Sequence, residues 1–238
     1  MHHVRPEGGV PKARRLAAFM KTLAVLSRKG GTGKTTVSLH LAMAAWLSGK
    51  GVLLADCDRQ GSAQEWRRER TIAGPVVFST KTPALFATQQ AAQRAGRDLM
   101  IIDTSPSASE DLAEAVRCAD FCLMILRPSF LDVRAVRETA ELVGRFGKPG
   151  AFVINQAPPR RNGKEMACVG DTVAQLAAMS RPIMPIGLRA RIAYQSAVAE
   201  GRSVQETAPQ SAAALEVAGL WREVEAQLWP VALPAVAG

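Results

Sequence analysis

A glycine-rich loop between an apolar run and a helix-forming run is the feature that most constrains this chain. The loop reads S-R-K-G-G-T-G-K-T-T over residues 27–36, after the apolar residues 23–26 and before residues 37–42. A strand, a glycine-rich turn and a helix in this order gather backbone N–H groups and a helix N-terminus around one phosphate group. The sequence therefore predicts a phosphate-binding loop within an α/β domain.

Two side chains of this loop have the positions that nucleotide chemistry requires. Lys34 can reach the terminal phosphates as a point charge, and Thr35 can place its hydroxyl group on Mg²⁺. The common pattern G-x-x-x-x-G-K-[ST] is not met in full, because its first glycine would fall at Arg28. A second lysine, Lys29, lies directly before Gly30 instead. This lysine distinguishes the loop from the common phosphate-binding pattern.

Strand-like and helix-like segments alternate along the rest of the chain, which predicts a mostly parallel twisted sheet with helices on both faces. Strands are expected at residues 22–27, 52–55, 76–78, 99–102, 121–126, 151–154 and 183–186. Helices are expected at residues 34–48, after a cap at Ser62, from Thr82, at 110–117, after a cap at Asp132, and at 165–179, 191–200 and 212–228. Residues 1–20 are expected to be a disordered basic tail before a single domain, residues 21–238.

Composition is that of an ordinary soluble protein, since 47% of the 238 residues are hydrophobic and 21% are charged. No apolar run approaches the roughly 20 residues that a membrane span requires. The 4 cysteines show no C-x-x-C spacing and follow no secretory leader, so reduced thiols in a cytoplasmic protein are expected. The formal net charge of +9 fits either a polyanionic partner or a basic protein without one.

Three carboxylates follow predicted strands: Asp56 and Asp58 come after residues 52–55, and Asp103 comes after residues 99–102. In an open α/β sheet, ligands bind at the carboxyl ends of the strands. A carboxylate there can hold a water molecule of Mg²⁺, although it can also be a plain turn residue or a helix cap. With a phosphate-binding loop upstream, the sequence favours the metal role.

Several motifs resemble those of the ParA/MinD family of deviant Walker A ATPases, which have a P-loop NTPase fold. Residues 29–36 resemble the family's Walker A motif, residues 56–63 its D-x-D-P-Q-G-S motif, and residues 102–106 its Walker B motif. Residues 153–156, 188–194 and 200–204 resemble later segments of short plasmid-type ParA proteins. Arg59 replaces the proline that usually follows the second aspartate, which leaves that loop less constrained and adds a charge near the phosphates.

The resemblance implies a site for ATP with Mg²⁺. The residues that it implies in nucleotide binding are Lys29, Gly30, Gly31, Thr32, Gly33, Lys34, Thr35, Thr36 and Asn155. The implied metal ligands are Thr35, Asp56 and Asp103. Asn155 would pair with adenine through its amide group. No Asn-Lys-x-Asp sequence is present to select guanine.

The resemblance also implies catalytic roles for Lys29, Lys34 and Asp58. Lys29 would cross the interface of an ATP-bound sandwich homodimer and neutralise charge on the partner's nucleotide, as an arginine finger does elsewhere. Asp58 would position the attacking water. Half of each active site would then belong to the other subunit.

The favoured hypothesis is a cytoplasmic, nucleoid-associated partition ATPase that segregates plasmid or chromosomal DNA. Arg189, Arg191 and Arg202 fall where the family places its non-specific DNA contacts. A ParB-like centromere-binding or adaptor protein would stimulate hydrolysis and release the dimer. Membrane docking is disfavoured, because Arg222 is the only basic residue after Arg202.

Two alternative functions stay open on the sequence. One is an orphan ParA/MinD-type positioning ATPase that acts on a protein cargo or a membrane site, since the cargo is set by a partner. The other is a metabolic enzyme of the dethiobiotin synthetase type, which phosphorylates a small substrate. Lys29 and the D-x-D-x-Q-G-S segment argue against the enzyme.

Overall fold

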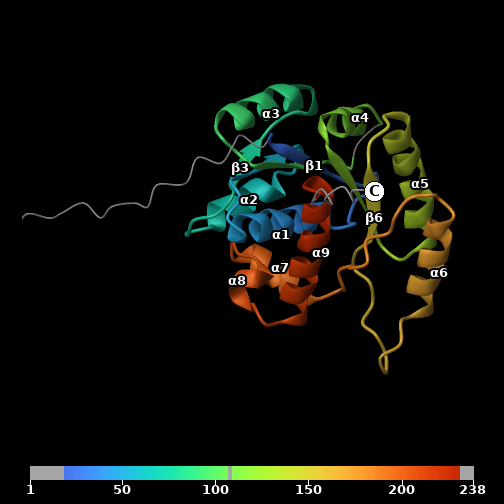
Figure 1. Ribbon diagram of the computed structural model, residues 1–238. Helices are drawn as coiled ribbons and strands as arrows, with labels where there is room; N and C mark the ends of the chain where they lie inside the picture. Colours follow the sequence, from blue (N-terminus) through green and yellow to red (C-terminus); the bar gives the residue numbers. More distant parts are fainter. Residues whose placement is uncertain (1–18, 107–108, 231–238) are drawn as a thin grey trace, which may run out of the picture.

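The computed structural model describes residues 19–106 and 109–230. Within these residues, six parallel strands form one sheet in the order β3-β2-β4-β1-β5-β6, and helices lie on both of its faces (Figure 1). The strands are β1 (Lys21–Leu26), β2 (Val52–Asp56), β3 (Val76–Ser79), β4 (Leu99–Asp103), β5 (Phe121–Leu126) and β6 (Gly150–Ile154). This architecture confirms the predicted α/β fold with a parallel sheet.

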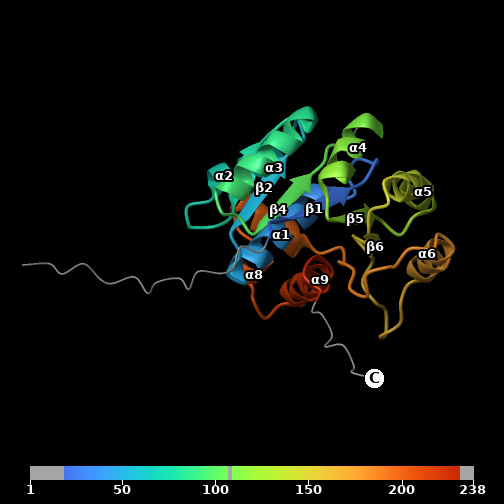
Figure 2. The same cartoon turned by 45° about the horizontal axis from the view of Figure 1, so that its top comes forward.

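The helices divide between the two faces of the sheet, as Figure 2 shows for α3–α6 on one side and α9 on the other. Their bounds are α1 (Lys34–Leu47), α2 (Ser62–Glu69), the 3-10 turn η1 (Thr82–Ala84), α3 (Leu85–Arg94), α4 (Ser109–Cys118), α5 (Phe130–Arg145), α6 (Ala167–Ala177), α7 (Ile192–Ala199), α8 (Val204–Thr207) and α9 (Ala212–Leu228). Alternate side chains of each strand separate the core: Leu23 and Val25 pack towards α1, and Ala24 and Leu26 pack towards α3–α6. Over the described residues, no helix has the length and hydrophobicity to cross a membrane.

Two predicted helix caps are wrong. The Ser129 side chain accepts a hydrogen bond from the backbone N–H of Asp132, so α5 begins at Phe130 and its cap is Ser129. Asp132 is therefore released for contacts outside its own helix. The residue before α2 is Gly61, with φ 66°, and Ser62 is the first helical residue rather than the cap.

The predicted strand at residues 183–186 is also wrong. Only an isolated parallel bridge joins Phe152 to Ile183, and Pro182, which faces β6, has no N–H to extend a ladder. The segment still follows β6, since Leu188 N–H donates to the Ile154 carbonyl at 3.0 Å. The four-residue helix α8 was not predicted, although the sequence Ser203-x-x-Glu206 is a capping box, which indicates the start of a helix.

Most of the predicted tail, residues 1–18, lies outside the described residues. The two residues that precede β1 are described, and they differ in environment. Met20 is buried in the core with only 8% of its surface exposed, whereas Phe19 is 81% exposed. The folded domain therefore includes Met20, which the prediction had assigned to the tail.

A buried arginine at the end of α2 contacts α8 and the loop that precedes it. The Arg70 guanidinium donates to both carboxylate oxygens of Glu206, at 2.7 and 3.0 Å, and to the Gly201 carbonyl at 2.9 Å. Four residues before Arg70, about one helical turn, Trp66 Nε1 donates to the Arg202 carbonyl at 2.9 Å. Gly201 has φ 63°, and a Cβ there would lie 2.5 Å from the backbone nitrogen of Arg70. This close approach requires glycine.

We expect Gly201→Ala to lower the free energy of unfolding by about 2–4 kcal/mol, because a methyl group there overlaps the Arg70 backbone. Gly147→Ala is the matched control. Gly147 has a similar φ of 61° but open space around it, so only the backbone strain of about 1 kcal/mol is expected. Urea unfolding followed by tryptophan fluorescence measures both changes, and equal losses would contradict the steric explanation.

Candidate functional site

The loop between β1 and α1 presents backbone donors and a lysine at the carboxyl edge of the sheet. Gly33, with φ 88°, precedes α1, whose first N–H groups have no acceptors within the helix. Lys34 Nζ lies 3.4 Å from the Lys29 carbonyl oxygen, across the loop. Burial lowers the pKa of Lys34, while Asp103 and Asp58 oppose that effect. The loop therefore has the donors and the positive charge that a phosphate group requires.

Two carboxylates meet beside this loop, because β2 and β4 are neighbours and Asp56 pairs with Asp103 in register. Asp103 Oδ1 accepts a hydrogen bond from Ser38 Oγ at 3.1 Å, and Asp56 Oδ1 accepts one from the Asp58 N–H at 3.1 Å. Burial raises the pKa of Asp103 to about 7 and also raises the pKa of Asp56. Both aspartates lie at the edge where the sequence placed them.

The buried carboxylates fit a hydrated divalent cation. Oδ2 of Asp56 and Oδ2 of Asp103 are both buried and have no hydrogen-bond partner among the described residues. Such orphaned oxygens are stabilised by a cation or by the water molecules that it holds. In residues 19–106 and 109–230, no group of three His, Cys, Asp or Glu side chains forms a metal site. A cation here would therefore take further ligands from Thr35, water and nucleotide phosphates.

Asp58 lies just beyond β2, in the loop that leads into α2. Its Oδ1 accepts a hydrogen bond from the Gln60 N–H at 3.0 Å, which fixes the carboxylate in a tight turn. The neighbouring Arg59 is exposed and has no side-chain hydrogen bond within the described part of the chain. The charge of Asp58 opposes the lowering of the Lys34 pKa. The catalytic role of Asp58 stays a prediction.

Lys29 does not reach across its own loop. Its Nζ donates to Asp132 Oδ1 at 2.7 Å, and the Asp132 side chain is only 1% exposed. Arg127 also holds Asp132, through Nε to Oδ2 at 2.9 Å and through a second nitrogen to Oδ1 at 3.2 Å. Although burial opposes them, the Arg127 and Lys29 hydrogen bonds hold the pKa of Asp132 well below its usual range. Asp132 thus has two cationic partners, and it stays paired if one leaves.

Sequence reasoning missed Asp132 and Arg127 as part of this site. It assigned Asp132 to a helix cap, a role that Ser129 fills. The available signal was a carboxylate and an arginine directly after β5, at the same sheet edge as the phosphate-binding loop. Neither residue belongs to one of the motifs, so the motifs alone do not assign them to the site.

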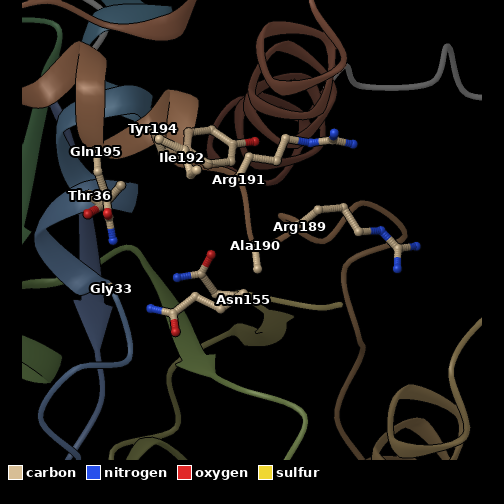
Figure 3. A pocket seen from close by; sticks show the side chains of 10 residues that line it. Gly33, Thr36, Asn155, Arg189, Ala190, Arg191, Ile192, Tyr194 and Gln195 are labelled. Carbon is tan, nitrogen blue, oxygen red and sulfur yellow. The ribbon is translucent and has the colours of Figure 1, made fainter. Parts of the chain in front are cut away.

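A cavity of about 270 Å³ opens beside α1 (Figure 3). Gly33 and Thr36 line one side, Asn155 and Gln156 the floor, and the segment that contains Arg191 and Tyr194 the other side. Its volume is close to the lower end of ligand pockets, about 300 Å³. The cavity continues the phosphate-binding loop and includes Asn155, the residue predicted to contact the base, so we refer to it as the base cavity.

Asn155 is buried and tied to the phosphate-binding loop. Its Nδ2 donates to the Thr32 carbonyl at 2.7 Å, and Gln156 Nε2 donates to the Gly31 carbonyl at 3.0 Å. One of the two amide hydrogens of Asn155 is therefore taken, which leaves its carbonyl oxygen and its second hydrogen for a ligand. Base recognition by Asn155 stays a prediction.

The three arginines predicted to bind DNA are not brought together. Arg189 and Arg191 both line the base cavity, and each is paired with a carboxylate, Glu165 and Glu216 respectively. Arg202 follows α7 and lies next to α2 instead, where its carbonyl accepts from Trp66. Non-specific DNA binding by these residues stays a prediction.

We expect Asp103→Asn to raise the free energy of unfolding without ligands at pH 8 by on the order of 2 kcal/mol. The pKa of Asp103 is about 7 in the folded protein and 3.8 in the unfolded chain. The aspartate therefore lowers the free energy of unfolding as the pH rises between these two values. The gain from asparagine should therefore be larger at pH 8 than at pH 5. Thermal unfolding tests this, and Mg²⁺-ATP should stabilise the parent protein but not the variant. A variant less stable than its parent at pH 8 would contradict the burial argument.

Comparison with known proteins places this site in a family. The CobQ/CobB/MinD/ParA nucleotide binding domain matches residues 23–204. The Maintenance of carboxysome distribution protein A of Halothiobacillus neapolitanus is 32% identical over 197 residues, which cover 77% of this chain and 86% of that protein. The protein of the same name from Gloeobacter kilaueensis is 31% identical over 191 residues, 79% of this chain and 85% of that protein.

A solved structure is similar in fold. Apo McdA of Cyanothece superposes with a TM-score of 0.71 at 16% identity and covers 88% of this chain and 100% of that one. The match to the domain spans more than half of this chain and contains the loop, both buried aspartates and Asn155. This chain is a member of the CobQ/CobB/MinD/ParA nucleotide-binding family.

Proposed function

We propose that this protein is a Mg²⁺-dependent ATPase that positions a protein cargo and acts as an ATP-bound homodimer on non-specific DNA. The position of Lys29 carries the proposal, because this lysine flanks the phosphate-binding loop yet contacts Asp132 rather than its own phosphate site. Two relatives named for carboxysome distribution support a protein cargo. They favour cargo positioning over segregation of plasmid or chromosomal DNA, which the sequence motifs had put first.

Lys29 can leave Asp132 at a small electrostatic cost. After it leaves, Arg127 still contacts both carboxylate oxygens of Asp132, and the Arg127 backbone N–H donates to Oδ2 at 3.1 Å. The buried carboxylate is therefore never left without a partner, which would cost about 3–5 kcal/mol. In an ATP-bound dimer, Lys29 would extend to the partner's nucleotide and stabilise the charge that develops on its phosphate oxygens.

The other residues of the site would act within one subunit. Lys34 and the first turn of α1 would hold the terminal phosphates, Thr36 the α-phosphate, and Asn155 the base. Mg²⁺ held through Thr35, Asp56 and Asp103 supplies charge neutralisation on the phosphates. Asp58 would accept a hydrogen bond from the attacking water. The water oxygen would form a bond to the γ-phosphorus while the bond between that phosphorus and the ADP oxygen breaks. The products would be ADP and phosphate.

DNA binding on this proposal requires Arg189 and Arg191 to exchange their carboxylates for DNA phosphates. Each pair is exposed or half-buried, so solvent and salt weaken it and the exchange costs little. Arg202 would add a contact from the far side of α7. An adaptor protein of the ParB type would stimulate hydrolysis and release the dimer from DNA.

We expect Lys29→Ala to bind ATP as a monomer, because the residue that reaches the second nucleotide is lost. Asp58→Ala is the matched variant in the same site, and it should bind ATP, form the dimer and fail to hydrolyse ATP. Light scattering with Mg²⁺-ATP measures the dimer, and phosphate release measures turnover. A dimer in Lys29→Ala, or unchanged turnover in Asp58→Ala, would contradict the proposed roles.

For DNA binding, we expect Glu165→Gln to strengthen the affinity of the ATP-bound protein, because it releases Arg189. Arg189→Ala should weaken the affinity, and Glu141→Gln on the exposed surface of α5 serves as the control for charge alone. Fluorescence anisotropy with a random-sequence duplex at about 50 mM and about 200 mM salt measures these changes. Binding that ignores nucleotide, or that is absent at the lower salt, would overturn the DNA part of the proposal.

A further inference from the structure

The sheet face that carries α3–α6 is left uncovered over its edge strand, β3. Leu53 and Ala55 of β2 pair in register with Val76 and Phe78 of β3, so these four side chains point to the same face. Leu53 is 8% exposed and Ala55 is fully buried, whereas Val76 is 38% and Phe78 51% exposed. The apolar layer therefore continues onto β3, although no described helix covers it there.

A groove of about 1520 Å³ occupies this position. Val76, Phe78 and Leu53 form its apolar floor. Its wall is the side of α3 that carries Ala87 and Ala91, and Ala95, the cap directly after the helix, continues this spacing of four residues. Figure 2 shows α3 on this side of the sheet, with α4 as the next helix along it. The groove thus lies between a helix wall and the open edge of the sheet.

Positive charge follows the groove. Arg59, Lys81 and Arg97 line it, and within the described residues none of their side chains has a salt bridge. The two acidic residues that line it, Asp58 and Asp111, lie at the end where β2 and α4 meet the candidate ATP site. Arg59 and Lys81 follow β2 and β3 at that same end, and Arg97 precedes β4 at the opposite end, so cations border the groove at both of its ends.

We propose that this groove binds an amphipathic helix of a partner protein, with one apolar face and acidic residues at the borders of that face. The exposed side chains stand perpendicular to the sheet, so the ligand lies over β3 rather than beside it. A helix is the element that usually covers the face of a parallel sheet. Alanines on α3 permit the close approach of 8–10 Å between helix axes that such packing needs.

Charge selects between possible ligands of the groove. Residues 1–18 carry four basic side chains, Arg5, Lys12, Arg14 and Arg15, and a second copy of this chain has a net charge of +9. Both would bring like charge to the arginines and the lysine that line the groove. An acidic partner segment brings the opposite charge and is therefore favoured.

The position of the groove connects this partner with hydrolysis, a consequence that rests on the proposed function. Asp58, Arg59 and Gln60 line its end from the β2 side, and Ser105 and Pro106 line it from the β4 side. These residues belong to the loops that directly follow the strands bearing Asp56 and Asp103. A helix in the groove contacts both loops, so its binding changes the geometry around Asp58 and the rate of ATP hydrolysis.

Two synthetic peptides of about 18 residues, five helical turns, test the proposal on the full chain. They share one leucine face, which is bordered by glutamate in the first and by lysine in the second. Fluorescence anisotropy should show binding of the glutamate peptide, weakened at least about tenfold by Phe78→Ser and by Ala91→Gln. Phe86→Ser is the matched control, because Phe86 is 63% exposed on α3 but does not line the groove. Its affinity should equal that of the parent.

Charge reversal provides a second arm. Lys81→Glu combined with Arg97→Glu should transfer the preference to the lysine peptide. Equal binding of both peptides by the parent, no binding of either, or equal effects of Phe78→Ser and Phe86→Ser would overturn the proposal. It would also be overturned by tighter peptide binding after deletion of residues 1–18, or by a dimer that Phe78→Ser abolishes, since these results identify the other two ligands.

Turnover separates this proposal from the function on which it rests. Saturating glutamate peptide should change the steady-state rate of ATP hydrolysis in the parent and in Phe86→Ser. Peptide binding without any change in rate would overturn the link to hydrolysis. A protein that hydrolyses no ATP, with or without peptide, would overturn the proposed function and this link together, while the anisotropy measurements would still decide whether the groove binds a helix.

Discussion

Two carboxyl groups buried side by side are the constraint on which the candidate site depends. The parallel register of β2 and β4 places Asp56 against Asp103, and each keeps one buried oxygen without a hydrogen-bond partner among the described residues. Burying like charges is unfavourable unless a cation or hydrogen bonds compensate it. Ser38 and the Asp58 N–H supply part of that compensation, and a hydrated Mg²⁺ beside bound phosphates would supply the remainder. Burial of these two carboxyl groups thus carries an electrostatic cost that binding of a cation would relieve.

The cations around the phosphate-binding loop divide into two groups with different environments. Lys34 is buried beside the carboxylates and faces inward, as a group that serves its own subunit must. Lys29 is partly exposed and paired with Asp132, on the side of the loop near Arg127. Since Arg127 can hold Asp132 alone, the pairing of Lys29 is reversible. Reversibility is what a residue needs if it alternates between its own subunit and another.

The fold and much of the site could be predicted because their signals are local. Apolar runs that end in Asp56, Asp103 and Asn155 identify buried parallel strands together with the side chains at their ends. The segment at residues 183–186 is also mostly apolar, yet the preceding Pro182 has no N–H to extend a ladder to β6, and strand propensity alone does not include that loss. Contacts between distant segments were not predictable, since Lys29 and Asp132 are 103 positions apart and only the tertiary fold joins them.

The same limit explains the arginines. Sequence position grouped Arg189, Arg191 and Arg202 as one DNA-binding set, because similar motifs flank them. In the fold, Glu165 and Glu216 pair with the first two beside the base cavity, and α7 lies between them and Arg202. A count of basic residues cannot reveal such neutralisation, which depends on carboxylates 24 and 25 positions away along the chain.

The buried contacts of Arg70 limit how the loop that carries Asp58 can move. Helix α2 has eight residues and a length of about 12 Å, with this loop at one end and the buried Arg70–Glu206 pair at the other. Movement of the whole helix would break that pair, so α2 is held in place. Any rearrangement around bound nucleotide is then confined to the few residues before the helix, with Gly61 as the pivot, because it has a positive φ and open space around it.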